Sequence, residues 1–417
     1  MKLLVISNLF YPDRGGGASV FSSLCFGLCR KGWDVTVFTT YPYYPEWRRK
    51  AGASPWRLQR ETVQGVDVWR HGLYVPRNPS RLLPRIGYEL SFAVSLMRSL
   101  FRGGPFDVVM VYCPMLGAVG FAALRKLLRR EPLWLNVQDI PADAAAASGI
   151  SRSGLFNHFA QTAQRLIFNR ADVWSTICPV MVDRLAAMRT RQQPLHLCPN
   201  WLNDSLAACI DQLPSKLGRA PGRPLRLLYA GNIGKKQGLL EFCQLAARTD
   251  AAFQFQINGN GGESGTLRAW VAQCGDARFA FGEFLDESGF AQALHAADVF
   301  VITEKAGSGA SFIPSKLIPA IASATPILGV CDRSGPLGRE MSEARLGVVA
   351  EWGQPLDAVF AQLSNPERFA DFQRQCVNHA QCYRGHLAIE RWDTLFKQLP
   401  LGATTAGFQG GCRFEKT

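Results

Sequence analysis

Short apolar runs alternate along the first half of the chain with longer amphipathic stretches. The runs predict strands at residues 3–7, 34–40, 107–112, 133–139 and 171–177, with helices between them. In the stretch after the first strand, Val20, Leu24 and Leu28 share one helix face, and Gly32 ends the helix. Strands that alternate with helices predict the α/β class with a doubly wound, mainly parallel sheet.

The second half of the chain repeats this pattern. Strands are predicted near residues 225–230, 253–257, 278–281, 298–303, 326–330 and 347–350. A length of 417 residues exceeds one typical core and favours two domains. We place them at residues 1–205 and 206–385, with the Pro- and Gly-rich segment 214–224 at the boundary. A helix within 386–400 is expected to pack back on the first domain, and 401–417 to form a flexible tail.

Between the predicted strands of the first domain, residues 41–80 are predicted to be irregular. This segment is rich in Tyr, Trp and Arg, which suit a ligand surface. We assign Tyr43 and Tyr44 within it to the acceptor side of a site.

Three polar loops with glycines follow strands of the second half: LRLLYAGNIGKKQG, FQFQINGNGG and GSGASFIPSK. Glycines let a backbone approach a ligand closely, helix N-termini favour anions, and ligands bind at the carboxyl ends of parallel strands. These loops therefore predict a phosphate site, although each alone is also compatible with an ordinary strand-to-helix turn. The candidate residues are Gly231, Asn232, Gly234, Lys235, Gln237, Gly259, Gly261, Gly309, Ser311, Ser315 and Lys316.

Composition places the chain among globular proteins, because 47% of its residues are hydrophobic and 19% are charged. Its twelve cysteines are scattered without a C-x-x-C pair, which is typical of reduced core residues in a cytosolic protein. The first strand follows Met1 almost directly, so no secretion signal is expected. Pro114 interrupts the longest apolar run, 108–124, which argues against a membrane span.

The positive charge is concentrated in the first half. Residues 1–200 hold 25 Lys and Arg against 12 Asp and Glu, whereas residues 201–417 hold 21 of each. Arg81, Arg85, Arg98 and Arg102 flank the apolar stretch YELSFAVSLM. A basic amphipathic helix favours an anionic membrane surface as a partner, or else a core helix with a solvated basic edge. Nucleic acid is not favoured, because aromatic residues are not interleaved with the basic ones.

Nicotinamide binding is not favoured either. Gly15, Gly16 and Gly17 lack a third spaced glycine, and the second strand ends in Thr39 and Thr40 where a ribose-binding carboxylate is expected.

The segments PYYPEW, LYVPRNPS, VQD, PNW, GNIGKKQG and PSKL occur in an order that resembles the family-4-type retaining glycosyltransferases of the GT-B fold. Within that family the chain resembles the colanic-acid type of bacterial exopolysaccharide clusters. The resemblance implies two facing Rossmann-like domains with the cleft between them. It further implies transfer from a nucleotide-sugar to a lipid-linked or saccharide acceptor, without a cofactor or an essential metal. The expected location is cytoplasmic, peripheral on the inner membrane.

The resemblance also assigns roles to individual residues. It places Gly16 near the donor diphosphate and the acceptor, and Gln138 and Asp139 where many relatives have a catalytic His-Asp pair. Asn232 and Gln237 stand where the family has its diphosphate-binding arginine and lysine. The charge is then expected from Lys235, Lys236 or Lys316.

The paired glutamates of the family are expected at Ser311 and Pro319, so neither carboxylate is present. Glu304 is the nearest acid, and it either hydrogen-bonds the donor sugar or caps a strand. These departures keep two alternatives open. One is a catalytically lapsed sugar-nucleotide-binding subunit, and the other is a sugar-nucleotide epimerase of the same fold.

Overall fold

The computed structural model describes residues 1–13, 17–44, 46–49, 54, 56–77, 82–140, 154–220, 222–307 and 314–399. Internal contacts divide the chain into two compact units, one made of residues 1–199 and 386–417 and the other of residues 200–385. The division follows Pro199 and so comes slightly before the boundary expected at residue 205. The expected tail, 401–417, lies outside the described residues.

The first unit contains an eight-stranded sheet in the order β3-β4-β2-β1-β5-β6-β7-β8. Its strands are β1 (Lys2–Ile6), β2 (Asp34–Thr40), β3 (Gln59–Val63), β4 (Val66–His71), β5 (Val108–Cys113), β6 (Leu133–Val137), β7 (Val173–Thr176) and β8 (Leu195–Leu197). Neighbouring strands are parallel except β3 and β4. Because β1 lies between β2 and β5, the sheet is doubly wound, as predicted.

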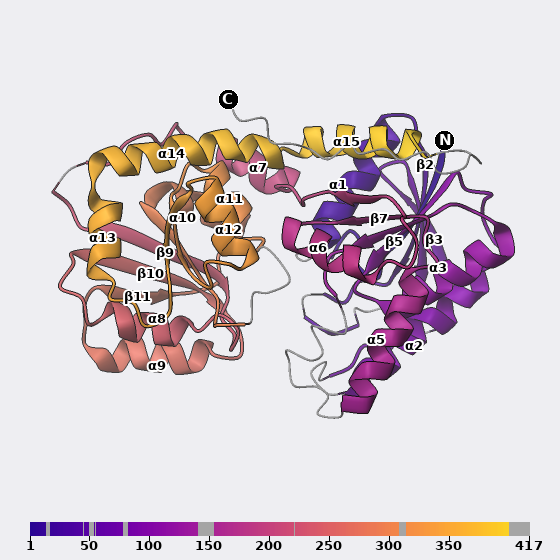
Figure 1. The fold of residues 1–417 in the computed structure, drawn as a ribbon, viewed down its shortest axis with the longest axis horizontal. Coiled ribbons are helices and arrows are strands. Elements are labelled where there is room, and N and C mark those ends of the chain that lie inside the picture. Colours follow the sequence, from indigo (N-terminus) through magenta and orange to yellow (C-terminus); the bar gives the residue numbers. More distant parts are fainter. Residues whose placement is uncertain are drawn as a thin grey trace. The chain divides into compact units, whose positions relative to one another are not determined.

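Helices surround this sheet (Figure 1). They are α1 (Gly17–Arg30), α2 (Leu82–Leu96), the 3-10 turn η1 (Met97–Ser99), α3 (Leu116–Arg129), α5 (Gly154–Phe168), α6 (Pro179–Met188) and α15 (Gly385–Lys397). Helix α15 packs on the first unit, where Trp33 Nε1 donates to Asp393 Oδ1 at 2.8 Å. Because Gly27 faces Ile389 of α15, α1 is buried on more sides than the single face expected. Across the described ranges, no helix is both long and apolar enough to cross a bilayer.

The segment predicted to be irregular contains a β-hairpin. Strands β3 and β4 pair antiparallel, and β4 continues the parallel sheet beside β2. Gln64 and Gly65 connect them with φ angles of 48° and 86°, as a two-residue hairpin turn with positive φ at both positions requires. The prediction was wrong because β3 is mostly polar and exposed, so it lacks an apolar run. The Gln-Gly pair between two valines was the signal that marked the turn.

The second unit contains a six-stranded parallel sheet in the order β11-β10-β9-β12-β13-β14. Its strands are β9 (Leu225–Asn232), β10 (Phe253–Asn260), β11 (Phe279–Gly282), β12 (Val299–Thr303), β13 (Ile327–Val330) and β14 (Gly347–Ala350). All six predicted strands are therefore present, and this order is that of a Rossmann sheet.

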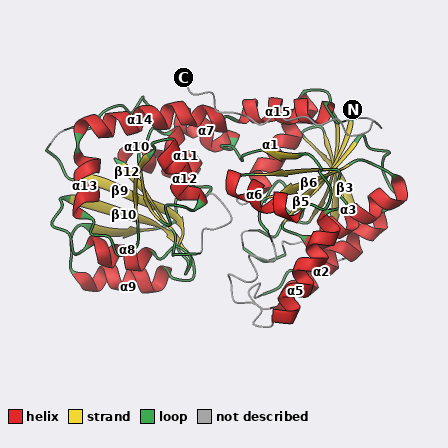
Figure 2. Cartoon of the chain, in the orientation of Figure 1, coloured by secondary structure: helices red, strands yellow, loops and turns green. Residues whose placement is uncertain are grey.

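Both faces of the second sheet are covered by helices (Figure 2). They are α7 (Asp204–Asp211), α8 (Leu239–Ala246), α9 (Ser264–Cys274), α10 (Glu287–Ala296), α11 (Leu317–Ala322), α12 (Pro336–Glu343), α13 (Asp357–Ser364), α14 (Pro366–Ala380) and the 3-10 turn η2 (Gln381–Tyr383). Alternate residues of β9 enter different cores: Leu227 and Tyr229 pack with α8, whereas Leu228 and Ala230 pack with α11 and α12. This alternation explains the continuous apolar run in the sequence, because both faces of the strand are buried.

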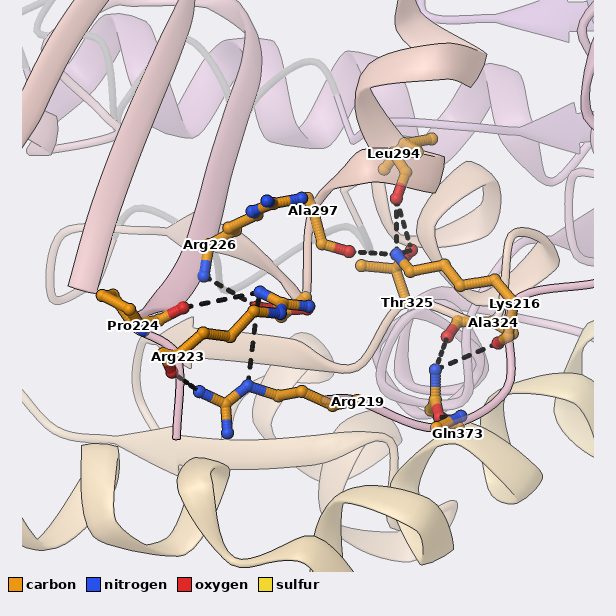
Figure 3. Close-up of polar contacts among 12 residues, drawn as sticks. Lys216, Arg219, Arg223, Pro224, Arg226, Leu294, Ala297, Ala324, Thr325 and Gln373 are labelled. Carbon is orange, nitrogen blue, oxygen red and sulfur yellow. Dashed lines mark hydrogen bonds and ion pairs between the residues drawn. The ribbon is translucent and has the colours of Figure 1, made fainter. Parts of the chain in front are cut away.

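The segment 214–224, expected to be the domain boundary, packs along the second unit (Figure 3). Lys216 Nζ donates to carbonyl oxygens at the end of α10, including that of Leu294 at 2.6 Å. Arg223 forms a bidentate ion pair with buried Asp298, at N–O distances of 2.5 and 2.6 Å. The boundary prediction was wrong because these basic side chains bind distant partners that local composition cannot reveal.

Candidate functional site

At the carboxyl edge of the first sheet, a buried hydroxyl cluster holds the loops after β1 and β2. Tyr43 Oη lies 2.5 Å from Tyr88 Oη, and Asn8 Nδ2 donates to both at 2.8 Å. Asp13 Oδ1 accepts the backbone N–H groups of Tyr43 and Tyr44 at 3.0 and 3.1 Å. Tyr43 is only 1% exposed, so, contrary to expectation, it offers no surface to an acceptor. Tyr44 is half-buried and keeps part of its ring accessible.

Gln138 and Asp139 follow β6 at the same edge. Gln138 Nε2 donates to Asn136 Oδ1 at 2.8 Å, and both predicted residues are half-buried. Burial raises the pKa of Tyr112 above its usual range, and the negative charge of Asp139 adds to this rise. A side chain at Gly17, the first residue of α1, would come within 2.5 Å of the Tyr112 hydroxyl. The loop after β6 therefore lies near the beginning of α1, whereas Gly16 lies outside the described residues.

Glu89 is a further carboxylate of the first unit that sequence reasoning missed. Its Oε2 accepts the N–H of Gly117 near the beginning of α3 at 3.2 Å. Burial raises the pKa of Glu89 to about 7, against the opposing effects of this hydrogen bond and of Arg85. The sequence offered one indication of Glu89, because no other acidic residue occurs between Asp67 and Asp107.

In the second unit, two of the predicted loops leave the sheet where the strand order reverses. Strand β9 lies between β10 and β12, so the connections after β9 and β12 lead to opposite faces. Such a reversal leaves a crevice at the carboxyl ends of the two strands. Asn232 ends β9 and Glu304 directly follows β12, so the fold brings both predicted residues to this edge.

Lys316 reaches the same edge from the segment before α11. Its Nζ donates to Tyr229 Oη at 2.8 Å, lies 3.9 Å from the centre of the Tyr229 ring, and is 3.4 Å from the carbonyl oxygen of Asn232. Burial lowers the pKa of Lys316 to about 7, and within the described ranges no carboxylate pairs with it. An ammonium held without a counter-ion at this edge is suited to binding an anion.

Gly231 makes room for this lysine. Its φ is 124°, and a Cβ atom there would lie 2.7 Å from Lys316 Cε. The glycine that we predicted to approach a ligand thus also allows the side chain of Lys316 to cross β9. The N-terminus of α11, by contrast, contributes little, because the helix has only six residues.

The loop after β9 closes into a tight turn. Gly234 N–H donates to Gln237 Oε1 at 3.0 Å, and Gln237 N–H donates to Gly234 O at 3.1 Å. Lys235 is exposed at the tip of this turn, and Gly238, the residue before α8, has a φ of 62°. Gln237 therefore shapes the loop through its amide group, whereas Lys235 is free of the constraints that hold Lys316.

Gly259 and Gly261 allow the end of β10 to lie against the loop after β9. A side chain at Gly259 would collide with Gly231 O, and one at Gly261 would collide with Ile233 O. Both glycines were predicted to bind the donor. In the structure they are needed for the close approach of the two loops, which sets the position of Asn232.

Glu304 is 8% exposed, and its carboxyl oxygen Oε1 has no hydrogen-bond partner in the part of the chain that is described. Burial raises its pKa to about 7. The backbone of the residue is fixed, because its N–H donates to Val330 O at 2.9 Å and its carbonyl accepts from Trp352 Nε1 at 2.6 Å. Among the described residues, Oε1 therefore does not cap a strand, which is the simpler of the two roles expected for this carboxyl group.

The third predicted loop is described only in part. Gly309 and Ser311 lie outside the described residues, whereas Ser315 is exposed directly before Lys316. A surface cavity of about 460 Å³ lies elsewhere in this unit, where Gly347 begins β14 and α14 passes. Because it is at the amino end of a parallel strand, we do not include it in the candidate site.

A family model described as a glycosyl transferase 4-like domain matches residues 15–201. The chain is also 30% identical over 334 residues to WcaI of Escherichia coli (strain K12), which is named as a colanic acid biosynthesis glycosyl transferase. This match covers 77% of the chain and 81% of WcaI. The chain belongs to the glycosyl transferase 4-like family.

Solved structures confirm the fold predicted from the sequence. Sucrose-phosphate synthase from Thermosynechococcus elongatus matches with a TM-score of 0.69 and 15% identity, over 95% of this chain and 98% of that one. Anabaena HepE, solved in complex with UDP, matches with a TM-score of 0.65 and 14% identity, over 96% and 100% of the two chains. Both likenesses establish the GT-B architecture of two Rossmann-like domains.

The structure shows what Asn232 and Gln237 do at the two positions where the family is expected to have an arginine and a lysine. At the position where the resemblance implies an arginine, the carbonyl of Asn232 accepts from Tyr229 Oη at 2.5 Å and lies near Lys316 Nζ. At the position of the expected lysine, Gln237 stabilises the turn. In this member of the glycosyl transferase 4-like family, Lys316 is a basic residue that hydrogen bonds hold at the edge of the sheet.

Proposed function

We propose that the protein is a retaining glycosyltransferase that moves a sugar from a nucleotide-sugar to a lipid-linked or saccharide acceptor. The observation that carries the proposal is Lys316, an ammonium group at the crevice of a Rossmann sheet that has no counter-ion among the described residues. The structures of Anabaena HepE with UDP and with UDP-glucose support a nucleotide-sugar as the donor class.

In this proposal, the chain acts by positioning and by charge. The Lys316 ammonium faces the diphosphate and stabilises the negative charge that grows on it as the bond to the sugar breaks. Glu304 is close to half-protonated at neutral pH, because its pKa is about 7, so its carboxyl group either donates to or accepts from a sugar hydroxyl. Holding the donor in one geometry supplies the remainder of the barrier reduction. No step requires a metal ion.

The similarity to WcaI supports a role in bacterial exopolysaccharide or cell-surface polysaccharide synthesis. A lipid-linked acceptor requires the enzyme to work beside a membrane, and the basic first half of the chain suits an anionic surface. We therefore place the protein on the cytoplasmic face of the inner membrane as a peripheral protein.

One observation favours a second candidate function, a catalytically lapsed sugar-nucleotide-binding subunit. The glutamine that stands in place of the family's lysine is neutral and accepts a hydrogen bond within the loop, so it brings no positive charge to stabilise the departing diphosphate. Such a subunit binds the donor but transfers nothing. Binding and transfer therefore have to be measured separately.

The experiment is a thermal-shift screen against UDP-, GDP-, ADP- and dTDP-sugars, followed by a transfer assay with detection by mass spectrometry. A donor present at a hundred times its Kd raises the unfolding free energy by about 2.7 kcal/mol. We expect one donor class to bind and a glycosylated product to form, with equal yield in EDTA. Binding without any product identifies the lapsed subunit, an isomerised donor identifies an epimerase, and the absence of binding contradicts both nucleotide-sugar proposals.

A further inference from the structure

One side of α2 carries a row of exposed apolar side chains. Five large residues on α2 and the turn after it are between 43% and 79% exposed, namely Leu83, Leu90, Val94, Met97 and Phe101. Their spacings of seven, four, three and four residues place them on one side of the helical segment. Polar side chains normally occupy the outer side of a surface helix, so this row requires an explanation.

The row is not a misplaced part of the core. The opposite side of α2 faces inward, where Tyr88, Phe92 and Leu96 are buried. Helix α2 packs beside α3, and α3 packs beside α5 (Figure 1). One side of α2 thus packs against the core of the unit, and the row on the other side is exposed in the described structure.

The neighbouring helix extends the apolar surface. Leu127 and Leu128 near the end of α3 are 71% and 49% exposed. Two positions before them, Arg125 Nη1 donates to Ser99 O and Leu100 O at 3.0 Å, which ties this end of α3 to the turn that carries Phe101. The apolar row and the two leucines therefore belong to one end of the α2–α3 pair.

The charges around this surface have one sign. Helices α2, α3 and α5 contain a single acidic residue, Glu89, whose carboxylate binds the beginning of α3. Arg98, Arg102 and Arg130 are exposed beside the apolar residues. An exposed apolar row bordered by arginines is typical of helices that lie in the interface of an anionic membrane.

We propose that α2 docks on an anionic phospholipid bilayer, with the apolar row entering the boundary between headgroups and acyl chains and the arginines contacting lipid phosphates. The proposal rests on the membrane location included in the proposed function and adds the docking surface and its mode of binding. A second copy of the chain suits this surface poorly, because a two-fold contact would bring together two surfaces that are both bordered by arginines.

The test compares two matched variants of the full chain in vesicle flotation. Leu90→Ser with Phe101→Ser removes part of the row. Leu217→Ser with Phe284→Ser removes side chains of the same types, 65% and 66% exposed, from the second unit. Each large apolar side chain that moves from water into lipid strengthens binding roughly tenfold. We therefore expect the first variant to bind phosphatidylglycerol-containing vesicles about 100-fold more weakly, and the second to bind as the unchanged protein does.

Salt separates the apolar contribution from the electrostatic one. The unchanged protein should keep part of its binding to anionic vesicles at high salt, whereas Arg98→Gln with Arg102→Gln should lower the low-salt affinity and weaken the salt dependence. Equal flotation of the Leu90/Phe101 variant and the unchanged protein overturns the proposal. So does a dimer in analytical ultracentrifugation that this variant dissociates, because the row is then an interface between copies.

Two further measurements keep the result interpretable. The serine substitutions lie on the surface, so the variants should melt at nearly the same temperature as the unchanged protein; if the first variant unfolds, Val94→Ser alone replaces it, with a tenfold loss expected. Nucleotide-sugar binding without vesicles should be the same in all variants. A failure of donor binding thus contradicts the proposed function, whereas a failure of flotation contradicts only the docking surface.

Discussion

Replacing Lys316 by methionine should make the folded protein more stable and the enzyme much weaker. Methionine keeps most of the length of the lysine side chain but removes a charge that no carboxylate in the described part of the chain pairs with. A lysine that serves only the fold produces the opposite effect on stability. The two measurements together therefore distinguish a ligand-binding cation from a structural one.

The expected magnitude follows from the lowered pKa. The pKa of Lys316 falls from 10.5 to about 7, and each unit of pKa corresponds to about 1.4 kcal/mol. Because the side chain is only half-buried, we expect the substitution to raise the unfolding free energy at pH 7 by about 2–4 kcal/mol. Loss of one positioned charge should lower kcat/KM by about 100- to 1000-fold.

The pH dependence has a definite sign. Between pH 7 and 10.5 the unfolded chain binds a proton at Lys316 that the folded chain has largely lost, so the stability of the unchanged protein rises with pH in this range. The penalty is fully present below pH 7 and disappears near pH 10.5. The advantage of Lys316→Met in urea unfolding should therefore be largest near pH 7 and shrink as the pH approaches 10.

Lys216→Met is the matched control. Burial also lowers the pKa of Lys216, to about 8, but its ammonium donates to backbone carbonyls and to Thr325 Oγ1. Removing it relieves the cost of burying the charge but leaves several buried acceptors unpaired, so this variant should gain clearly less stability than Lys316→Met and should bind donor normally once folded. A destabilised Lys316→Met that keeps full donor affinity refutes the reasoning. If Lys235→Ala then loses activity, the diphosphate is bound by the exposed turn.

Three other predictions concern stability. Glu304→Gln should be more stable than the unchanged protein by about 2–3 kcal/mol at pH 8 but not near pH 4.5. The folded-state pKa is raised, so ionisation of the buried carboxyl group costs stability only above the pKa of the unfolded chain, and urea titrations at both pH values test this. Gly65→Ala should lower the unfolding free energy by about 1–2 kcal/mol, because the φ angle of Gly65 is 86° and the new Cβ atom would lie 2.8 Å from Cys29 Sγ. An unchanged midpoint of urea unfolding would contradict the hairpin turn. Asp393→Ala should destabilise the first unit by about 1–3 kcal/mol, because it leaves the buried Trp33 N–H unpaired, and faster hydrogen exchange in α15 is the readout.

The second sheet was predictable because its central strands β9, β12 and β13 are largely buried on both faces. A strand such as β9 enters two cores, so nearly all its side chains are apolar and the run is visible in the sequence. The hairpin at Gln59–His71 was missed for the opposite reason. Strand β3 lies at an edge, pairs with only one neighbour and is polar, so its place depends on pairing with β4 rather than on burial.

The candidate site was predictable in its members but not in their partners. Lys316 and Glu304 could be selected because they follow strands that end at one edge of a parallel sheet. The sequence could not show that Tyr229, 87 residues away, receives the hydrogen bond of Lys316. It also placed Tyr43 on a ligand surface, whereas hydrogen bonds to Tyr88 and Asn8 hold that hydroxyl inside the domain.

Asn232 and Gln237 stand where the family is expected to have an arginine and a lysine, so the site contains two fewer positive charges near Lys316. The backbone carbonyl of Asn232 accepts from Tyr229 Oη and lies 3.4 Å from Lys316 Nζ, which holds the ammonium at the end of β9, and the neutral side chain at position 232 adds no positive charge beside it. A neutral residue at position 237 closes the turn and adds no positive charge next to that ammonium. Because no carboxylate in the described ranges raises its pKa, the lysine remains near its titration point until a dianionic diphosphate arrives. Donor binding should therefore take up a proton above pH 7, which calorimetry in buffers of different ionisation enthalpy would detect. If no proton is taken up, Lys316 does not face the diphosphate.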